Sequence, residues 1–359
     1  MKIQVLLIII ALCLTGFSQS RISELEEQIK TAKGKEKADL FNDLGKEYCF
    51  KGNFDYAKNY FFQALHLNEE ISNKKGVSKT LNNIGVIYLY QSDYKAALEY
   101  YEKSLSIDKD INNNEGMAHT LNNMGLIHFY LDNLGKSLQY YKQSYALYEE
   151  LNNKPEMANA LFQIGQTYYQ SDQLEDAETQ FAKSLELYEK AADNAGLAKV
   201  YHYMGQVSCE ENELEKAGNY FAKAIEYCEK TSDYALKTRI HTAYAKMLFK
   251  NNQADKALLQ LNKSNKLAKD YDFKSLLVNN YMLCAEIYEK QNDFKKSLEY
   301  FKLYTQLRED LNNEENTIQI IELQNRNSLE RKQLELQILK KEKEIFELQY
   351  EIDSIKKVK

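Results

Sequence analysis

The stretch TLNNIGVIYLYQSDYKAALEYYEKSLSI (residues 80–107) is followed forty residues later by TLNNMGLIHFYLDNLGKSLQYYKQSYAL (residues 120–147). The same forty-residue spacing extends beyond this pair. A small residue marks each copy, at Gly45, Gly85, Gly125, Gly165, Gly205, Ala245 and Ala285. Twelve residues after each mark stands a second small residue, and four residues further stands a large apolar one. Three such columns in register over seven copies indicate an array of repeats.

Each copy predicts a pair of antiparallel helices. Leu81, Ile84 and Tyr88 recur at helical spacing around the glycine mark, and Ala97 and Tyr101 do so after a short polar turn. The small residues allow the two helices to approach closely, and the aromatic residue fills the adjoining groove. The turns that join the copies, such as NNN and NNK, supply residues that tolerate the left-handed conformation at helix ends.

Composition agrees with an all-α protein. Only 13 Gly and one Pro in 359 residues are too few for the many tight turns of an all-β fold. A chain with 44% hydrophobic and 28% charged residues is folded rather than disordered. Its net charge of −6, without a basic block, argues against nucleic acid as a partner.

The first 18 residues have the pattern of a secretory signal peptide. Lys2 gives a positive start, residues 5–17 are uninterruptedly apolar, and Gly16 and Ser18 are suitably small for cleavage after Ser18. We therefore expect an exported, periplasmic protein. Retention of the segment as a membrane anchor is the alternative, although the apolar run is short for a bilayer. Lipid attachment at Cys13 is disfavoured because Leu12 is not small.

No motif in the sequence indicates catalysis. The cysteines after the signal segment are Cys49, Cys209, Cys228 and Cys284, without a C-x-x-C pair, and helical positions favour buried thiols. A glycine-rich phosphate loop, a nucleophile elbow and a zinc motif are all missing. We therefore expect neither an enzyme nor a cofactor or metal.

The repeat resembles the tetratricopeptide repeat, a family of helix pairs that stack into a superhelix. The residues that carry the resemblance are Leu81, Ile84, Gly85, Tyr88, Ala97, Tyr101 and Ser104. The resemblance covers about seven copies over residues 38–310 and weakens in the sixth, which has His241 and Ala245. The TLNN-x-G opening looks like that of kinesin light chains and related peptide-binding arrays. Residues 21–37 are expected to form a helix that caps the first repeat.

This resemblance implies a concave groove that is lined by the first helix of each pair and holds a protein or peptide. The carboxamides expected in the groove are Asn42, Asn82, Asn83, Asn122, Asn123 and Gln163. Carboxamides offer both donors and acceptors, so they can pair with a peptide backbone. The alternative is that they bond a neighbouring helix or loop and only support packing. Tyr90, Tyr130 and Tyr169 extend the predicted surface.

Residues 311–359 depart from the repeat and predict a coiled-coil helix. The apolar seam consists of Leu334, Ile338, Ile345, Leu348, Ile352 and Ile355, with Lys341 as its one break. This seam favours a homodimer, whereas the alternative is a solvated helix that folds back on the last repeat.

The order of the parts, with a signal segment followed by repeats and then a coil, resembles that of the exported sensor region of bacterial signalling proteins. These proteins are of the histidine kinase or helix-turn-helix type. We therefore expect an exported, non-enzymatic scaffold that binds a protein or peptide. The alternative is the sensor portion of a signalling system that lacks its output domain and has a membrane-bound partner.

Overall fold

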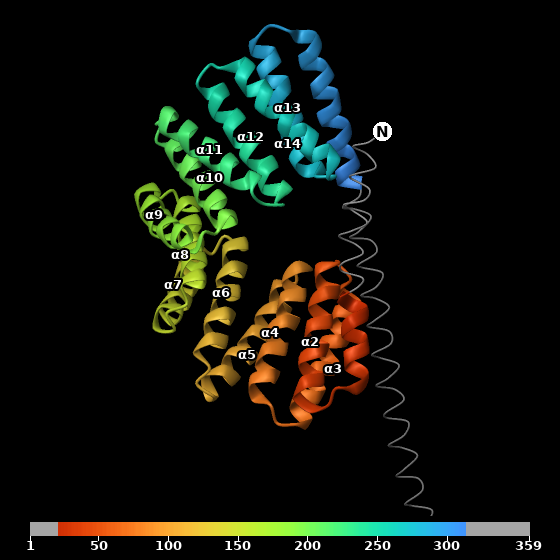
Figure 1. Ribbon diagram of the computed structural model, residues 1–359. Coiled ribbons are helices and arrows are strands. Elements are labelled where there is room, and N and C mark those ends of the chain that lie inside the picture. Colours follow the sequence, from red (N-terminus) through yellow and green to blue (C-terminus); the bar gives the residue numbers. More distant parts are fainter. Residues whose placement is uncertain (1–20, 314–359) are drawn as a thin grey trace, which may run out of the picture. The chain divides into compact units, whose positions relative to one another are not determined.

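The computed structural model describes residues 21–313, which form helices joined by short turns and contain no strand. The helices are labelled in Figure 1. The chain divides into two compact units, with the boundary between Ser232 and Asp233. The all-α repeat architecture predicted from the sequence is confirmed. The predicted signal segment (1–18) and the seam of the predicted coiled coil (334–355) lie outside the described residues.

The first unit contains a helix over residues 21–31 and five helix pairs. These are α2 (Gly34–Phe50) with α3 (Phe54–Glu70), α4 (Lys74–Tyr90) with α5 (Tyr94–Asp110), α6 (Asn114–Tyr130) with α7 (Leu134–Glu150), α8 (Lys154–Gln170) with α9 (Leu174–Ala191), and α10 (Asn194–Glu210) with α11 (Leu214–Glu229). The second unit contains α12 (Tyr234–Lys250), α13 (Ala254–Asp270), α14 (Lys274–Lys290) and a helix over residues 294–313.

The first helix is shorter than the predicted span of 21–37. It ends at residue 31, and α2 already begins at Gly34. Lys33 is extended and Gly34 has a φ of 52°, a conformation that only glycine adopts without steric cost. Ile22 and Leu25 of the shorter helix are buried against Leu44 of α2. The helix therefore still covers the open side of the first repeat.

The turns between helices share one geometry every twenty residues. A residue with positive φ occupies each turn, at Gly52, Ser72, Ser92, Asn112, Asp132, Asn152, Asp172, Ala192, Asn212, Asn252, Asp272 and Asn292. The left-handed Asn112 and Asn152 confirm the expectation for the NNN and NNK turns. The series skips residue 232, where α11 is one residue shorter than most helices and the first unit ends.

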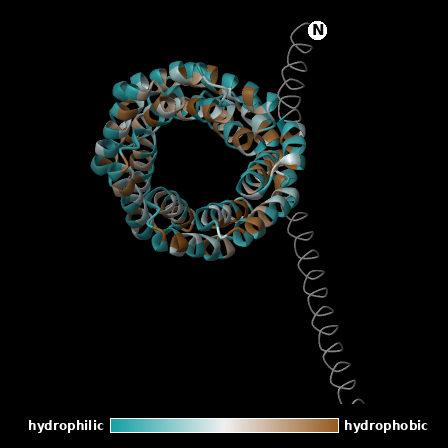
Figure 2. Cartoon of the chain, turned by 60° about the horizontal axis from the view of Figure 1, so that its bottom comes forward, coloured by the Kyte–Doolittle hydropathy of each residue, from teal (hydrophilic) through white to brown (hydrophobic). Residues whose placement is uncertain are grey.

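The glycine column fixes the distance between the two helices of a pair. A Cβ atom on Gly85 would lie 2.5 Å from Cε1 of Tyr101, and one on Gly125 would lie 2.7 Å from Cδ1 of Tyr141. Both tyrosines are at most 1% exposed. The aromatic ring therefore occupies the space that a side chain on the facing helix would need. Each helix buries one face in this way, so hydrophobic and hydrophilic segments alternate along the ribbons (Figure 2).

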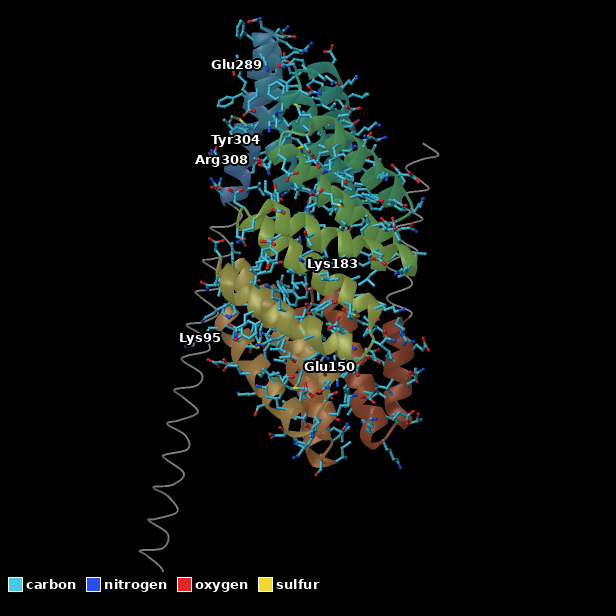
Figure 3. All side chains as sticks on the ribbon, turned by 90° about the vertical axis from the view of Figure 1, so that its left-hand side faces the viewer. Lys95, Glu150, Lys183, Glu289, Tyr304 and Arg308 are labelled. Carbon is cyan, nitrogen blue, oxygen red and sulfur yellow. The ribbon has the colours of Figure 1, made fainter. Side chains whose placement is uncertain are left out.

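The second unit has the same helix-pair arrangement, but side chains of different size fill the glycine and aromatic columns. In the sixth copy Ala245 stands in the glycine column, and Leu261, which is smaller than the aromatic residues, stands in the aromatic column and is fully buried. In the last described repeat, Phe301 is 44% exposed, because no further helix within residues 21–313 covers it. Arg308 donates a hydrogen bond to the Tyr304 hydroxyl on the same helix at 2.9 Å (Figure 3).

Two buried tyrosines supply a test of core packing. Tyr101 is fully buried and its hydroxyl has no hydrogen-bond partner among residues 21–313, whereas the hydroxyl of the buried Tyr148 lies 2.9 Å from Nδ1 of His119. Burial raises the pKa of both phenols. We expect Tyr101→Phe to raise the free energy of unfolding by about 1 kcal/mol, because it removes an unsatisfied buried group.

The matched substitution Tyr148→Phe should lower the free energy of unfolding by about 0.5–1.5 kcal/mol, because it removes a satisfied hydroxyl. Urea denaturation followed by circular dichroism compares the two variants. Equal losses of stability in both would show that the Tyr101 hydroxyl has a partner.

Candidate functional site

The first helices of the pairs face the inner side of the first unit. Helix α2 contacts α4, α4 contacts α6, and α8 contacts α10, whereas the second helices of successive pairs are not in comparably close contact. Stacked pairs that touch more closely on one side curve toward that side. The first helices therefore line the concave surface, as expected for the predicted groove.

A ladder of hydrogen bonds joins these first helices, and its first step connects α2 to α4. Asn42 is fully buried, and its Nδ2 donates to Oγ1 of Thr80 at 2.9 Å and to the carbonyl of Ala38 at 3.3 Å. Nδ2 of Asn83 in turn donates to Oδ1 of Asn42 at 3.1 Å. Asn42 is thus committed to a neighbouring repeat and is not accessible to a ligand, which corrects its predicted place in the groove.

The second step repeats the first one forty residues on. Nδ2 of Asn82 donates to Oγ1 of Thr120 at 2.9 Å, and Nδ2 of Asn123 donates to Oδ1 of Asn82 at 3.2 Å. Asn82 therefore carries out the packing role that the sequence left as the alternative.

The third step is not formed. Ala160 stands where Thr80 and Thr120 stand in the earlier copies, so Asn122 lacks the hydroxyl that would accept from its amide. The side-chain oxygens of Asn122 and Gln163 are both buried without a hydrogen-bond partner. Helices α6 and α8 are also not in contact as close as that of α2 with α4. The ladder thus ends at α6.

Asn83 and Asn123 keep most of their hydrogen-bonding capacity. Each uses one N–H of its amide on the ladder, and each is only partly buried. Among residues 21–313, neither Oδ1 accepts a hydrogen bond. The ladder therefore orients two amides whose second N–H and carbonyl oxygen remain free to bind a ligand.

Both amides line a cavity of about 500 Å³ between α4, α5 and α6, which we call the polar pocket. Its wall also includes Lys46, Lys75, Lys79 and Asp108. Hydroxyl groups of serine and threonine form part of its wall. The Oγ atom of Ser104 lies 3.0 Å from Oγ of Ser78 and 3.3 Å from Oγ1 of Thr120. Sequence reasoning missed Asp108 and the threonines, although Thr80 and Thr120 open the repeated TLNN stretch.

A second cavity of about 320 Å³ adjoins the first and shares Lys46 and Asn83 with it. We call it the apolar pocket, because its remaining wall is Cys49, Phe50, Gly52, Phe54, Phe61, Val86 and Tyr90. Tyr90 is 63% exposed and its ring stacks on Phe54 with a centroid distance of 6.1 Å. Burial raises the pKa of the Cys49 thiol, so this group stays neutral and adds to the apolar character.

The other two predicted aromatics lie in different surroundings. Tyr130 is 57% exposed and stacks on Tyr94, which repeats the Tyr90 arrangement one copy later. Tyr169 is partly buried with its ring edge against Tyr203 at 5.9 Å, and burial raises its pKa to about 12. The inner surface thus changes from carboxamide to aromatic between α6 and α10.

Residues 21–313 contain no group of three or more His, Cys, Asp or Glu side chains placed to hold a metal ion. None of the helices within these residues is long and apolar enough to span a membrane.

Comparison with known families gives one type of match. Sequence models of the tetratricopeptide repeat match residues 36–110, 116–190 and 278–311. No curated protein sequence matches the chain.

Several solved structures have a similar fold. A Rap protein complexed with competence and sporulation factor is 13% identical, with a TM-score of 0.60 over 80% of each chain. The apo form of the quorum sensor NprR from B. thuringiensis is 14% identical, with a TM-score of 0.54 over 80% of this chain and 92% of that one. A signal transduction ATPase with a tetratricopeptide repeat sensor from Pyrococcus horikoshii is 14% identical, with a TM-score of 0.67 over 83% of this chain and 45% of that one.

Proposed function

This chain belongs to the tetratricopeptide repeat family, and from that premise we propose that it is a non-enzymatic scaffold that binds an extended segment of a protein or peptide. The binding surface is the inner face of α4 and α6, where Asn83 and Asn123 meet the polar pocket. An extended backbone presents N–H and C=O groups at regular intervals, and a carboxamide can pair with one of each.

The observation that carries this proposal is the state of these two amides. The ladder holds each one by a single hydrogen bond, at 3.1 Å for Asn83 and 3.2 Å for Asn123. A side chain that is already oriented loses less conformational entropy on binding than a free one. The packing role and the binding role are therefore compatible: Asn42 and Asn82 fix the positions, and Asn83 and Asn123 present the free groups.

The similar structures support the same class of function. The Rap protein of this fold was solved in complex with a factor, and NprR is described as a quorum sensor. They also support the second candidate, in which the chain is the sensor portion of a signalling system. Co-purification with a membrane-bound kinase would favour that candidate over a scaffold with a soluble partner.

We also propose export through the segment 1–18 and dimerisation through the heptad seam of residues 334–355. Both rest on the sequence pattern. Cell fractionation with sequencing of the mature N-terminus tests export, and recovery of uncleaved protein from the cytoplasm would exclude it.

The binding proposal is tested by replacing both free amides with alanine. Peptides selected from a displayed random library on the wild-type protein serve as the probe. We expect the double variant Asn83→Ala with Asn123→Ala to keep its helix content, because alanine is the better helix former. It should lose affinity by about 1–3 kcal/mol per side chain, because backbone groups of the peptide are left unpaired.

The control variant replaces two exposed carboxamides on second helices, Asn59→Ala with Gln143→Ala, and should bind as the wild type does. Circular dichroism and calorimetric titration are measured on both variants. Wild-type affinity in a folded Asn83 and Asn123 variant would exclude the amides as the binding groups and would direct attention to Tyr90 and Tyr130.

A further inference from the structure

Asp108, in the last turn of α5, is a buried carboxylate with one oxygen that lacks a hydrogen-bond partner. It is 1% exposed and lies in the wall of the polar pocket. Its Oδ1 accepts from Nδ2 of Asn113 at 2.7 Å, and its Oδ2 is buried without a hydrogen-bond partner. A buried charge is costly unless a cation or several donors meet it. This group therefore lacks the compensation that its position requires.

The preceding repeat has the same side-chain hydrogen bond, but with an uncharged residue as the acceptor. There Asn68 takes the place of Asp108, and its Oδ1 accepts from Asn73 at 2.7 Å as Asp108 accepts from Asn113. Nδ2 of Asn68 donates to the Thr80 hydroxyl at 3.5 Å, so both ends of this amide have partners. Asn68 does not line the polar pocket. An amide at this position therefore finds partners for both its oxygen and its nitrogen. The carboxylate occurs only in the second of these two copies, where the residue lines the polar pocket.

Most of the lysines around the pocket are paired with carboxylates, so they repel an incoming cation less strongly. Lys75 lies 3.4 Å from Glu115, and Lys46 lies 3.5 Å from Asp43, so two of the three lysines at the rim are balanced. Lys79, the third, is exposed and can meet an acceptor on the same ligand.

We propose that the polar pocket binds a ligand through a primary ammonium group, with Asp108 as its acceptor. In the proposed peptide site, this ammonium belongs either to a lysine side chain or to the N-terminus of the bound peptide. The inference rests on the proposed function only for the identity of that carrier. The ammonium supplies the donor that Oδ2 lacks, and a charge-assisted bond in a buried site is among the stronger hydrogen bonds.

The first experiment measures thermal unfolding of the full chain without ligand. Asp108→Asn reproduces the satisfied amide of the preceding repeat, and we expect it to raise the Tm by about 2–4 °C. The matched variant Asn68→Asp places a carboxylate in the copy without the pocket and should lower the Tm. A Tm that falls in Asp108→Asn would show that the carboxylate serves the fold, and it would overturn the inference.

The second experiment adds n-butylammonium chloride, with n-butanol and sodium chloride as controls. We expect the wild-type Tm to rise with the amine alone and the Asp108→Asn variant to show no such rise. The same response in both proteins, or none in the wild type, would overturn the inference. This readout does not depend on peptide binding, so it separates failure of the inference from failure of the proposed function.

The third experiment identifies the carrier with the library-selected peptides. Replacing lysine by norleucine removes the side-chain ammonium, and acetylation removes the N-terminal one. One of the two changes should lower affinity for the wild type by about tenfold or more and leave affinity for Asp108→Asn unaffected. Binding peptides that tolerate both changes would support the proposed function and contradict the ammonium site.

Discussion

Replacing Gly125 by leucine is expected to lower the free energy of unfolding by about 1–3 kcal/mol or more. A Cβ atom at this position would lie 2.7 Å from Cδ1 and 2.8 Å from Cε1 of Tyr141. Tyr141 is 1% exposed, so its ring is enclosed by other parts of the protein. The leucine must therefore push α6 and α7 apart or force Tyr141 out of its preferred rotamer.

Gly135 provides a matched control in the same helix pair. A Cβ atom at Gly135 would meet nothing within 4 Å, and the residue lies in the first turn of α7. Gly135→Leu should therefore leave stability unchanged or raise it by up to about 1 kcal/mol, since leucine is the better helix former. Urea denaturation of both variants gives the comparison, and equal stabilities would contradict close packing at the glycine column.

The damage from Gly125→Leu should also be local. Each repeat contacts only its neighbours, so amide hydrogen exchange should accelerate in α5 to α8 and remain slow in α12 to α14. Faster exchange throughout the chain would indicate that the array unfolds as one cooperative unit.

The fold could be predicted because its determinants repeat along the sequence. Gly85 and Tyr101 recur in register in the neighbouring copies, so the pattern indicates both the helix pair and the close approach of its helices. The weakening at His241 and Ala245 falls in α12, the first helix of the second unit. The boundary itself coincides with a missing left-handed turn residue at position 232, which composition alone does not indicate.

The site could be predicted only in part, because periodicity assigns a position and not a partner. Asn42, Asn82 and Asn122 occupy one column, yet their partners lie one repeat further on. Where that partner is Thr80 or Thr120, its hydroxyl accepts from the amide N–H, and where it is Ala160 there is no hydroxyl to accept.

Asp108 was not predictable for a related reason. Its column contains Asn68 in the copy before and Tyr148 in the copy after, so no pattern marks the carboxylate. Only the three-dimensional structure shows that Asp108 is buried beside a cavity with one oxygen unpaired.

Asn42→Ala is expected to lower the free energy of unfolding by about 2–4 kcal/mol. Asn42 is fully buried, and its side chain takes part in three hydrogen bonds, to the Ala38 carbonyl, the Thr80 hydroxyl and the Asn83 amide. Alanine removes all three bonds and leaves a small cavity between α2 and α4.

The matched control is Asn59→Ala on α3, the partner helix of α2. Asn59 is exposed and accepts one hydrogen bond from Gln63, so its loss should change stability by no more than about 0.5 kcal/mol. Denaturation of both variants measures the contribution of the ladder. If Asn42→Ala were as stable as Asn59→Ala, the ladder would contribute nothing to stacking. Asn83 would then lack its fixed orientation, and the proposed preorganisation of the binding amides would fail with it.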